Sequence, residues 1–517
     1  MFKCLVNGYQ YPFHLDILKA LEKKNILKIT HWIQRPELFN DLDRDFESVK
    51  KYNYYDCIRA KYHEKYLKKT VNKEIDQIFF NEKRNLLNMA SRYNYYQNLS
   101  ERDMMQFIET HKNYWSTFFS ENEIDLILFE EIPHLLYDYC LYLIARSYKK
   151  KILIKEFANK LNSVVFIDDV YSRSKIGKNY YLKKNVPSQA IDEFISKVRG
   201  VSHNEALDII EKKTFELLKN NFLKKISRKF FYVFLNFRKY LFFKLKNEFL
   251  FKKNNFFLSK NSYVTELERD IFRLKSFFKN KKLTKIYNSK KIIVKTISKE
   301  KYVLFCSQMQ PEKTTFPEAG DFQDNIELLK IIRDNLPSNV KIFYREHPAT
   351  FMYFHNCYMY RNSKYYENIC SNKNTFLVPY NDDIFKYIDN SLAVITTTGT
   401  SGIEAAIRGK TVINFGSAWY SACKSIINIK SKKEIYKLEN IFKFKTDLND
   451  IKNFLYYLDN NYLRSELEIR SGDFVYNYKN KKLFSENFKK KNFSLYKSEI
   501  NKYEKYFVKA LSNENFR

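Results

Sequence analysis

Four of the nine glycines of this 517-residue chain fall in one stretch, LAVITTTGTSGIEAAIRGKTVINFGSAWY, at residues 392–420. Its first five residues are apolar or β-branched, which predicts a buried strand. A Gly/Ser/Thr turn, a short helix over 403–407 and a strand over 411–415 follow, and Gly409 takes the left-handed position that ends the helix. This succession is typical of an α/β fold with a parallel sheet.

The turn before the short helix suits a phosphate group. Residues 397–402, TTGTSG, place amide N–H groups and hydroxyls at the positive end of the helix dipole. Thr398, Gly399, Thr400 and Ser401 are therefore candidate phosphate-binding residues. The lysine of a Walker loop and the spacing of a dinucleotide fingerprint are missing, so an ordinary βαβ turn without a ligand is an equal alternative on the turn alone.

A second short motif follows another predicted strand. Residues 340–344 read as a strand, and Arg345, Glu346, His347 and Pro348 come at its carboxyl end. Ligands of open parallel sheets bind just beyond these ends. Pro348 favours an extended His347 and so helps to fix the imidazole. A purely structural histidine is the alternative interpretation.

Together with YVLFCSQMQPEKTT at residues 302–315, these motifs resemble the bacterial capsule polysaccharide biosynthesis proteins, a family that includes Kdo transferases. That family is similar to the GT-B type of glycosyltransferase. The resemblance implies an α/β fold with two Rossmann-like domains facing a cleft. It also implies an HP motif and a Ser/Thr motif that hold a CMP-sugar.

The same resemblance implies roles for single residues. His347 would contact the donor phosphate, with Arg345 and Gln310 also in the donor site. Thr400 and Ser401 would contact the phosphate or nucleotide. Glu404 would contact the ribose or base of the CMP-sugar.

A general base is needed because an acceptor hydroxyl loses its proton as it attacks. The strand predicted over 124–129 ends in EEIPH, which places Glu131 and His134 at the carboxyl end of a buried strand. Glu312, in the loop after the strand 302–306, would lie at the opposite edge of the cleft. These three residues are unranked candidates for the catalytic base. A helix-capping role for Glu131 and His134 is the alternative.

The charge balance indicates the kind of partner. The chain has 91 Lys and Arg against 59 Asp and Glu, a net charge of +32. This excess suits an acidic glycan or an anionic membrane surface. Compositional drift in a chain rich in Lys, Asn, Ile, Phe and Tyr is the alternative origin. No recognised nucleic-acid module accompanies the charge, so nucleic acid is not an expected partner.

The sequence gives no sign of a metal, a cofactor or a disulfide framework. Seven cysteines are scattered without CxxC spacing, and eight histidines form no HExxH cluster. The pair Asp168 and Asp169 lacks a third ligand. Neither a signal peptide nor an apolar run of about 18 residues is found. The expected location is the cytoplasm, with peripheral contact at the inner membrane.

The predicted elements divide the chain into four parts. Residues 1–172 form a Rossmann-like acceptor domain, and residues 291–430 form a second one that binds the nucleotide-sugar. A helical region over 173–290 lies between them. Its basic aromatic stretch at 224–253 fits either a membrane-interface helix or a packed helix with a solvated basic face. Helices over 431–517 are expected to cross back onto the first domain.

The sequence thus predicts a glycosyltransferase of capsule or surface-polysaccharide assembly. Its partners would be a nucleotide-sugar donor and a glycan or lipid-linked acceptor. The resemblance implies a CMP-activated acidic sugar such as Kdo. A sugar-nucleotide 2-epimerase, a CDP-polyol phosphate transferase and a non-catalytic assembly factor are the alternatives.

Overall fold

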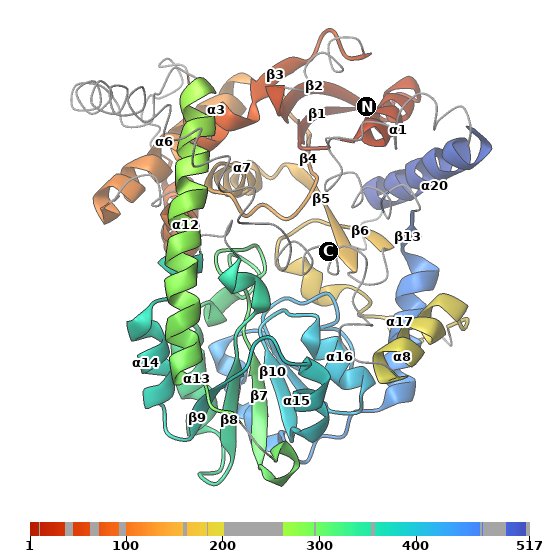
Figure 1. The fold of residues 1–517 in the computed structure, drawn as a ribbon. Helices are drawn as coiled ribbons and strands as arrows, with labels where there is room; N and C mark the ends of the chain where they lie inside the picture. The colour runs from red at the N-terminus through yellow and green to blue at the C-terminus, as the bar shows by residue number, and fades with distance from the viewer. Residues whose placement is uncertain are drawn as a thin grey trace.

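The computed structural model describes residues 1–9, 11–36, 45–62, 72–92, 100–158, 163–182, 185–200, 262–293, 296–352, 357–465, 468 and 493–512. Two mainly parallel sheets, one above the other in Figure 1, are lined by helices. The predicted α/β class with two Rossmann-like units is confirmed. The basic aromatic stretch at 224–253 lies outside the described residues.

Seven strands form the N-terminal sheet, in the order β13-β6-β5-β4-β1-β2-β3. Strands β1 to β5 pair in parallel, whereas β6 returns antiparallel to β5 and β13 runs antiparallel to β6. β4 is buried on both faces, which accounts for its continuous apolar sequence. The bounds are β1 Phe2–Asn7, β2 Leu27–Gln34, β3 Lys50–Asn53, β4 Leu126–Phe129, β5 Lys151–Ala158, β6 Ser163–Ile167 and β13 Leu463–Arg464.

Helices cover both faces of this sheet. Side chains of α1 and α20 pack on one face, and those of α5, α6 and α7 pack on the other. The bounds are α1 Pro12–Lys23, α3 Tyr54–Ile58, α4 Lys73–Asn81, α5 Lys83–Ser91, α6 Glu101–Glu121, α7 Leu136–Ser147, α8 Gln189–Gly200 and α20 Phe493–Ser512.

Six parallel strands form the C-terminal sheet, in the order β12-β11-β10-β7-β8-β9. The strand bounds are β7 Tyr302–Cys306, β8 Lys341–Arg345, β9 Thr375–Val378, β10 Ala393–Thr396, β11 Thr411–Phe415 and β12 Ile427–Ile429. The helix bounds are α12 Ser262–Lys290, α13 Asn325–Asp334, α14 Ser363–Ser371, α15 Ile384–Asn390, α16 Ser401–Ile407 and α17 Leu448–Asn461.

The end of the chain returns to the N-terminal sheet, as the sequence analysis expects. After α17, the short strand β13 pairs with β6, and α20 packs against α1. In Figure 1 this places α20 beside the upper sheet, far from the C-terminal sheet in which the preceding strands lie. Strand β3 was not predicted, because its short polar sequence KKYN gives no apolar alternation.

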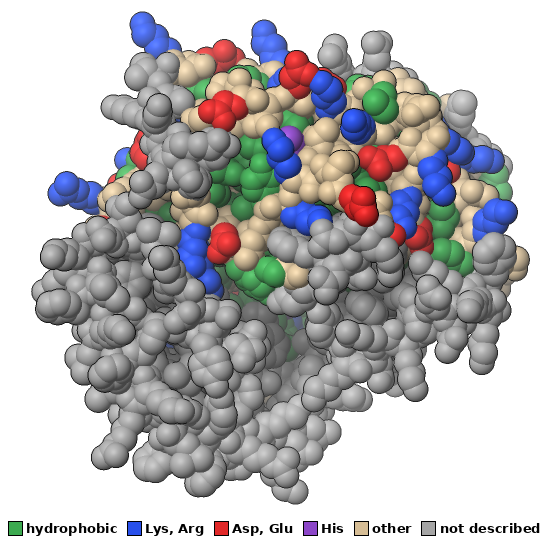
Figure 2. Space-filling model, turned by 90° about the horizontal axis from the view of Figure 1, so that it is seen from above, with side chains coloured by type: hydrophobic (Ala, Val, Ile, Leu, Met, Phe, Trp, Pro, Cys, Tyr) green, Lys and Arg blue, Asp and Glu red, His purple; other side chains and the backbone are tan. Residues whose placement is uncertain are grey.

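One continuous hydrophobic core joins the two sheets. It includes Ile127 of β4 as well as Val394 of β10. Polar contacts reinforce it: Asn88 of α5 donates to the side chain of Gln323 at 2.7 Å. Seen from above the N-terminal sheet, Lys and Arg side chains are interspersed with Asp and Glu over the described part of the surface (Figure 2). None of the described helices is both long and apolar enough for a membrane span.

Candidate functional site

The predicted donor residues lie at the carboxyl edge of the C-terminal sheet. Strands β10, β7 and β8 are neighbours there, and Thr396, Cys306 and Arg345 stand in one row of paired residues. The loops that leave these strands therefore start side by side. They carry the Gly/Ser/Thr turn, the QPE run (residues 310–312) and the HP motif.

Close contacts fix the Gly/Ser/Thr turn. A β-carbon on Gly399 would lie 2.3 Å from Nε2 of Gln308. That nitrogen donates to Oγ1 of Thr396 at 2.9 Å. Thr398 Oγ1 donates to the carbonyl of Thr314 at 2.9 Å. The turn is thus tied at two points to the loop after β7.

Tyr420 closes the other side of the turn. Its hydroxyl donates to the carbonyl of Gly399, and a β-carbon on Gly402 would lie 2.4 Å from the same hydroxyl oxygen. Thr400 and Ser401 remain half-buried at the start of α16. These two residues are therefore the part of the turn that can meet a ligand.

Glu404 is buried in the first turn of α16. It is 4% exposed, and its amide donates to the carbonyl of Thr400 at 3.1 Å. Nearby, burial raises the pKa of Cys306 to about 11 although the Ser401 hydroxyl opposes this shift. The Cys306 thiol is therefore neutral at physiological pH and adds no negative charge beneath the turn.

His347 is exposed at the carboxyl end of β8. Its Nδ1 accepts the amide of Ala349 at 3.2 Å. The proton of the neutral ring therefore lies on Nε2, which can donate to a phosphate oxygen. The backbone amide of His347 donates to Oε1 of Glu346 at 3.0 Å, so the buried neighbour orients the motif.

A buried ion pair that was not predicted from the sequence lies behind the HP motif. Arg361 Nε donates to Oε2 of Glu346 at 2.8 Å, and neither side chain is exposed. Burial would raise the pKa of Glu346, but Arg361 holds it below its ordinary value. Glu346 stands within the REHP motif and could have been selected. Arg361 lies in a different loop and has no local signal.

The same guanidinium holds the loop after β7. It donates to the carbonyl of Gln308 at 3.2 Å and to the side-chain oxygen of Gln310. Gln310 Nε2 in turn donates to the carbonyl of Gln323 at 2.7 Å. Gln310, predicted to bind the donor, is therefore engaged in positioning its own loop.

Arg345 is also engaged by the protein. Its Nη2 donates to the carbonyls of Tyr380 and Asp382 at 2.6 and 2.9 Å. The residue is 7% exposed, and burial lowers its pKa. In this structure the guanidinium joins the end of β8 to the loop after β9.

The loop after β4 places His134 and Glu131 at the junction of the two sheets. His134 Nδ1 lies 2.8 Å from the carbonyl of Ile132, so this nitrogen carries the proton and Nε2 is the acceptor. Burial lowers the pKa of His134, and Arg92 lowers it further. Helix α7 begins only at Leu136, so the capping alternative for these two residues is wrong.

Glu312 lies across the junction, half-buried in the loop after β7. The next residue, Lys313, approaches Glu156 of β5 at 3.3 Å. Burial would lower the pKa of Lys313, but Glu156 and Glu131 are among the carboxylates that raise it. The structure thus brings the loops that carry Glu312 and Glu131 to the same junction.

Arg173 completes a buried cluster between the sheets. It pairs with Glu318 of the C-terminal half and lies 3.6 Å from Glu156 of the N-terminal half. Burial raises the pKa of Glu318 to about 7 against the effect of Arg173. For Glu156, Lys313 and Arg173 outweigh burial and lower the pKa.

Glu130, adjacent to the selected Glu131, turns toward α1 instead. Its carboxylate accepts the amide of Tyr9 at 2.8 Å and lies 3.6 Å from Nδ1 of His14. Burial raises the pKa of Glu130 to about 7. The EE pair at the strand end indicated a carboxylate here, but the sequence could not tell which of the two faces the junction.

The paired acidic residues after β6 make hydrogen bonds to the turn that follows and to α7. Asp168 accepts from the hydroxyl of Ser172 at 3.0 Å, and Asp169 accepts from Tyr142 at 2.6 Å. Within the described part of the chain, no group of three or more His, Cys, Asp or Glu side chains could hold a metal ion.

A family model matches just under half of the chain. Residues 174–424 match the model of the family described as capsule polysaccharide biosynthesis protein. The resemblance predicted from the motifs is thereby confirmed, and the matched region contains the QPE run, the HP motif and the Gly/Ser/Thr turn. A search of the curated proteins found no match.

Solved structures with a similar arrangement are distant. The β-Kdo 2,7 transferase KpsC of Thermosulfurimonas dismutans is 10% identical, with a TM-score of 0.29, over 87% of this chain and 89% of that chain. MnaA of S. aureus, solved with UDP, is 11% identical, with a TM-score of 0.23, over 93% and 97%. An α,α-trehalose-phosphate synthase from Burkholderia vietnamiensis is 8% identical, with a TM-score of 0.29, over 93% and 98%.

Proposed function

We propose that the chain is a glycosyltransferase of capsule or related surface-polysaccharide biosynthesis. One observation carries the proposal: the family match covers three loops that leave adjacent strands at one sheet edge. Residues 291–430 would bind a nucleotide-sugar donor, and residues 1–172 would bind the acceptor. The helical region 173–290 would connect them, and residues 431–517 would brace the first domain.

The donor is proposed to be a CMP-activated acidic sugar, such as Kdo. His347 would donate from Nε2 to a phosphate oxygen, with the Thr400 and Ser401 hydroxyls beside it. These donors would stabilise the negative charge that develops on the leaving phosphate as its bond to the sugar breaks. The buried pair of Glu346 and Arg361 would keep the HP motif in place.

The acceptor is proposed to be a glycan or a lipid-linked glycan, at the inner face of the membrane. Its hydroxyl would form the new bond to the anomeric carbon and give its proton to a base. Of the three candidates, His134 has the most support, because its lowered pKa keeps it neutral and its Nε2 is an acceptor. Glu131 and Glu312 remain candidates at the same junction.

Binding of CMP, CDP, UDP and UMP, measured by thermal shift and calorimetry, tests the proposal. CMP is expected to raise the melting temperature of the wild type by a few degrees, by mass action. His347→Ala should weaken CMP binding at least tenfold. The control is Tyr436→Ala, which removes an exposed ring from the same half of the chain and should bind as the wild type does.

Other outcomes would redirect the interpretation. A preference for UDP would favour the epimerase, and a preference for CDP would favour the polyol phosphate transferase. No binding of any of the four nucleotides would contradict the transferase and favour an assembly factor.

A further inference from the structure

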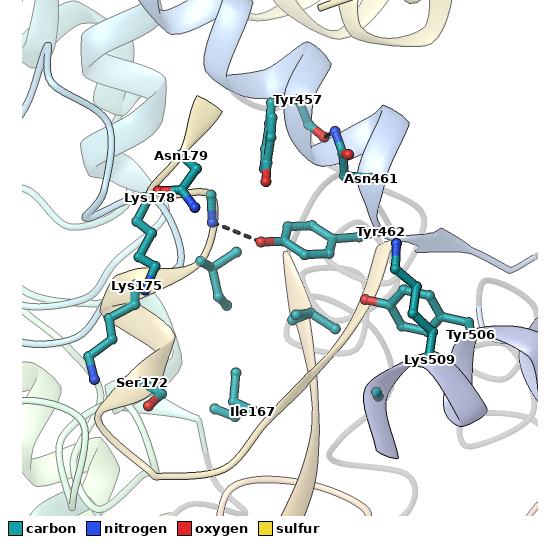
Figure 3. A pocket seen from close by; sticks show the side chains of 14 residues that line it. Ile167, Ser172, Lys175, Lys178, Asn179, Tyr457, Asn461, Tyr462, Tyr506 and Lys509 are labelled. Atoms are coloured by element: carbon teal, nitrogen blue, oxygen red, sulfur yellow. Dashed lines mark hydrogen bonds between the residues drawn. The ribbon is translucent and has the colours of Figure 1, made fainter. Parts of the chain in front are cut away.

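A cavity of about 400 Å³ opens at the edge of the N-terminal sheet, away from the predicted donor loops. It lies between β6, the loop 172–179, α17 and α20, so the returning C-terminal helices build one of its walls (Figure 3). Its volume falls in the range of about 300–1,000 Å³ that is usual for sites of small ligands.

The floor of the cavity is apolar and its wall is aromatic. Val165, Ile167, Ile176 and Ala510 are all buried beneath it. Three half-buried tyrosines stand above them: Tyr457, Tyr462 and Tyr506. Tyrosine offers a rigid apolar ring face together with a polar hydroxyl, a combination that suits the C–H face and the hydroxyls of a pyranose ring.

The wall is held in a fixed shape. Tyr462 accepts the amide of Gly177 at 2.8 Å, the bond that is dashed in Figure 3. Gly177 has φ +75°, and a β-carbon there would lie 2.7 Å from the ring of Phe454. The loop is therefore pressed closely against α17. A site whose walls are already ordered loses less entropy when it binds a ligand.

The rim of the cavity is cationic. Figure 3 shows Lys175 and Lys178 on one side and Lys509 on the other. All three are exposed, and among the described residues none of them has a carboxylate partner. None of the fourteen lining residues is acidic. Lys430 lies close enough to Lys175 for the two charges to interact.

We propose that this cavity binds a carboxylated sugar unit of an acidic glycan, as a second glycan site apart from the donor loops. The tyrosine rings and the apolar floor would pack against the sugar ring, and the lysines would pair with its carboxylate. The inference rests on the proposed function, because it makes the growing acidic polysaccharide the ligand. Ser172 lines the cavity, and its neighbour Arg173 reaches the junction of the two sheets. The same short segment therefore contacts both the cavity and the junction.

Calorimetry of the full chain with α2,8-linked oligosialic acid, an octamer that carries a carboxylate on every sugar, tests this site. The double variant Lys175→Ala/Lys509→Ala should bind the octamer at least tenfold more weakly than the wild type. The control Lys285→Ala/Lys330→Ala removes the same charge from exposed positions on α12 and α13 and should stay within twofold. An uncharged dextran oligomer should not bind to either protein.

A second variant tests the aromatic wall without changing the charge. Tyr457→Leu should weaken octamer binding several-fold by the same factor at low and at high salt, whereas the loss caused by the lysine variant should shrink as salt screens the charges. Circular dichroism and the melting temperature would show whether each variant is folded. Equal loss in the pocket and control lysine variants would overturn the proposal, as would no binding by the wild type at millimolar octamer.

Two further measurements separate this site from the donor site and from a simple anion site. CMP affinity, measured on the same variants, reports on the donor site. If the pocket variants bind CMP and still bind the octamer as the wild type does, only the second site is overturned. Octamer binding that needs the pocket, without any nucleotide binding, would support the second site and contradict the proposed transferase. Displacement of the octamer by an equal concentration of inorganic phosphate would overturn the assignment to a sugar.

Discussion

At the scale of single residues, Gly399 is where the turn depends most directly on the absence of a side chain. Its β-carbon would lie 2.3 Å from Gln308 and 2.9 Å from Thr396 Oγ1. Gly399→Ala should therefore displace the turn and weaken CMP binding at least tenfold. Because the Gln308 amide can move, stability should fall by only about 1 kcal/mol. Gly200→Ala, with open space around it, is the silent control. Unchanged CMP affinity would contradict the expectation.

The buried carboxyl group of Glu130 should make the stability of the protein depend on pH. Its pKa rises from 4.5 to about 7 on folding, mainly through burial. A raised carboxyl pKa gives stability that is complete below pH 4.5 and is lost as the pH rises through 7. Glu130→Gln should therefore gain stability relative to the wild type between about pH 5 and pH 8, by up to about 3 kcal/mol.

Urea unfolding of the wild type and of Glu130→Gln at about pH 5 and about pH 8 checks this expectation. The glutamine oxygen can still accept the amide of Tyr9, so the local contact is preserved. Glu131→Gln, which changes the exposed neighbour, is the control. If the difference between Glu130→Gln and the wild type is the same at both values, Glu130 does not titrate in this range.

At the scale of elements, Arg361 holds two loops on adjacent strands. Arg361→Met would leave the buried carboxylate of Glu346 without its positively charged partner, which costs about 3–5 kcal/mol. Glu346 has a lowered pKa, so its stabilising contribution is present above pH 4.5 and lost as the pH falls below it. The cost of the variant should therefore shrink at acid pH, measured by urea unfolding.

The double variant Arg361→Met/Glu346→Gln is the matched test of this pair. It removes both charges, so it should recover part of the stability that the single variant loses. The HP motif and the QPE run would still have lost their shared anchor, and CMP binding should stay weak. A double variant less stable than Arg361→Met alone would show that the pair acts through some other contact.

The strands were predictable because burial on both faces forces continuous apolar runs. β7 and β11 have the bounds that the sequence predicts. β3 and β13 were not predicted, since four and two residues of mixed polarity carry no periodic signal.

The residues of the candidate site also fall into those that could be predicted from the sequence and those that could not. Motif residues such as His347 could be selected, because they follow strands directly. Partners such as Arg361 and Tyr420 could not, because their contacts depend on how separate loops meet in three dimensions.

At the scale of the whole molecule, the two sheets are joined by a buried ion cluster and by exposed pairs. Arg173 and Glu318 are fully enclosed, whereas Arg84 and Glu327 link the same two halves at the surface, 3.4 Å apart. Burial decides their energies: an exposed pair contributes about 0–1 kcal/mol, and breaking a buried one costs about 3–5 kcal/mol. The stability of the contact between the two halves should therefore depend strongly on Arg173 and hardly at all on Arg84.

Arg173→Gln should lower the free energy of unfolding by about 3–5 kcal/mol, and Arg84→Gln by less than about 0.5 kcal/mol. Without Arg173, the carboxyl of Glu318 loses the charge that opposes its burial, so its pKa, already about 7, should rise further. Because a raised carboxyl pKa costs stability as the pH rises, Arg173→Gln should be least stable in alkaline buffer. Adding Glu318→Gln should remove part of that pH dependence. Equal losses for Arg173→Gln and Arg84→Gln in urea unfolding would mean that the buried cluster does not hold the two sheets together.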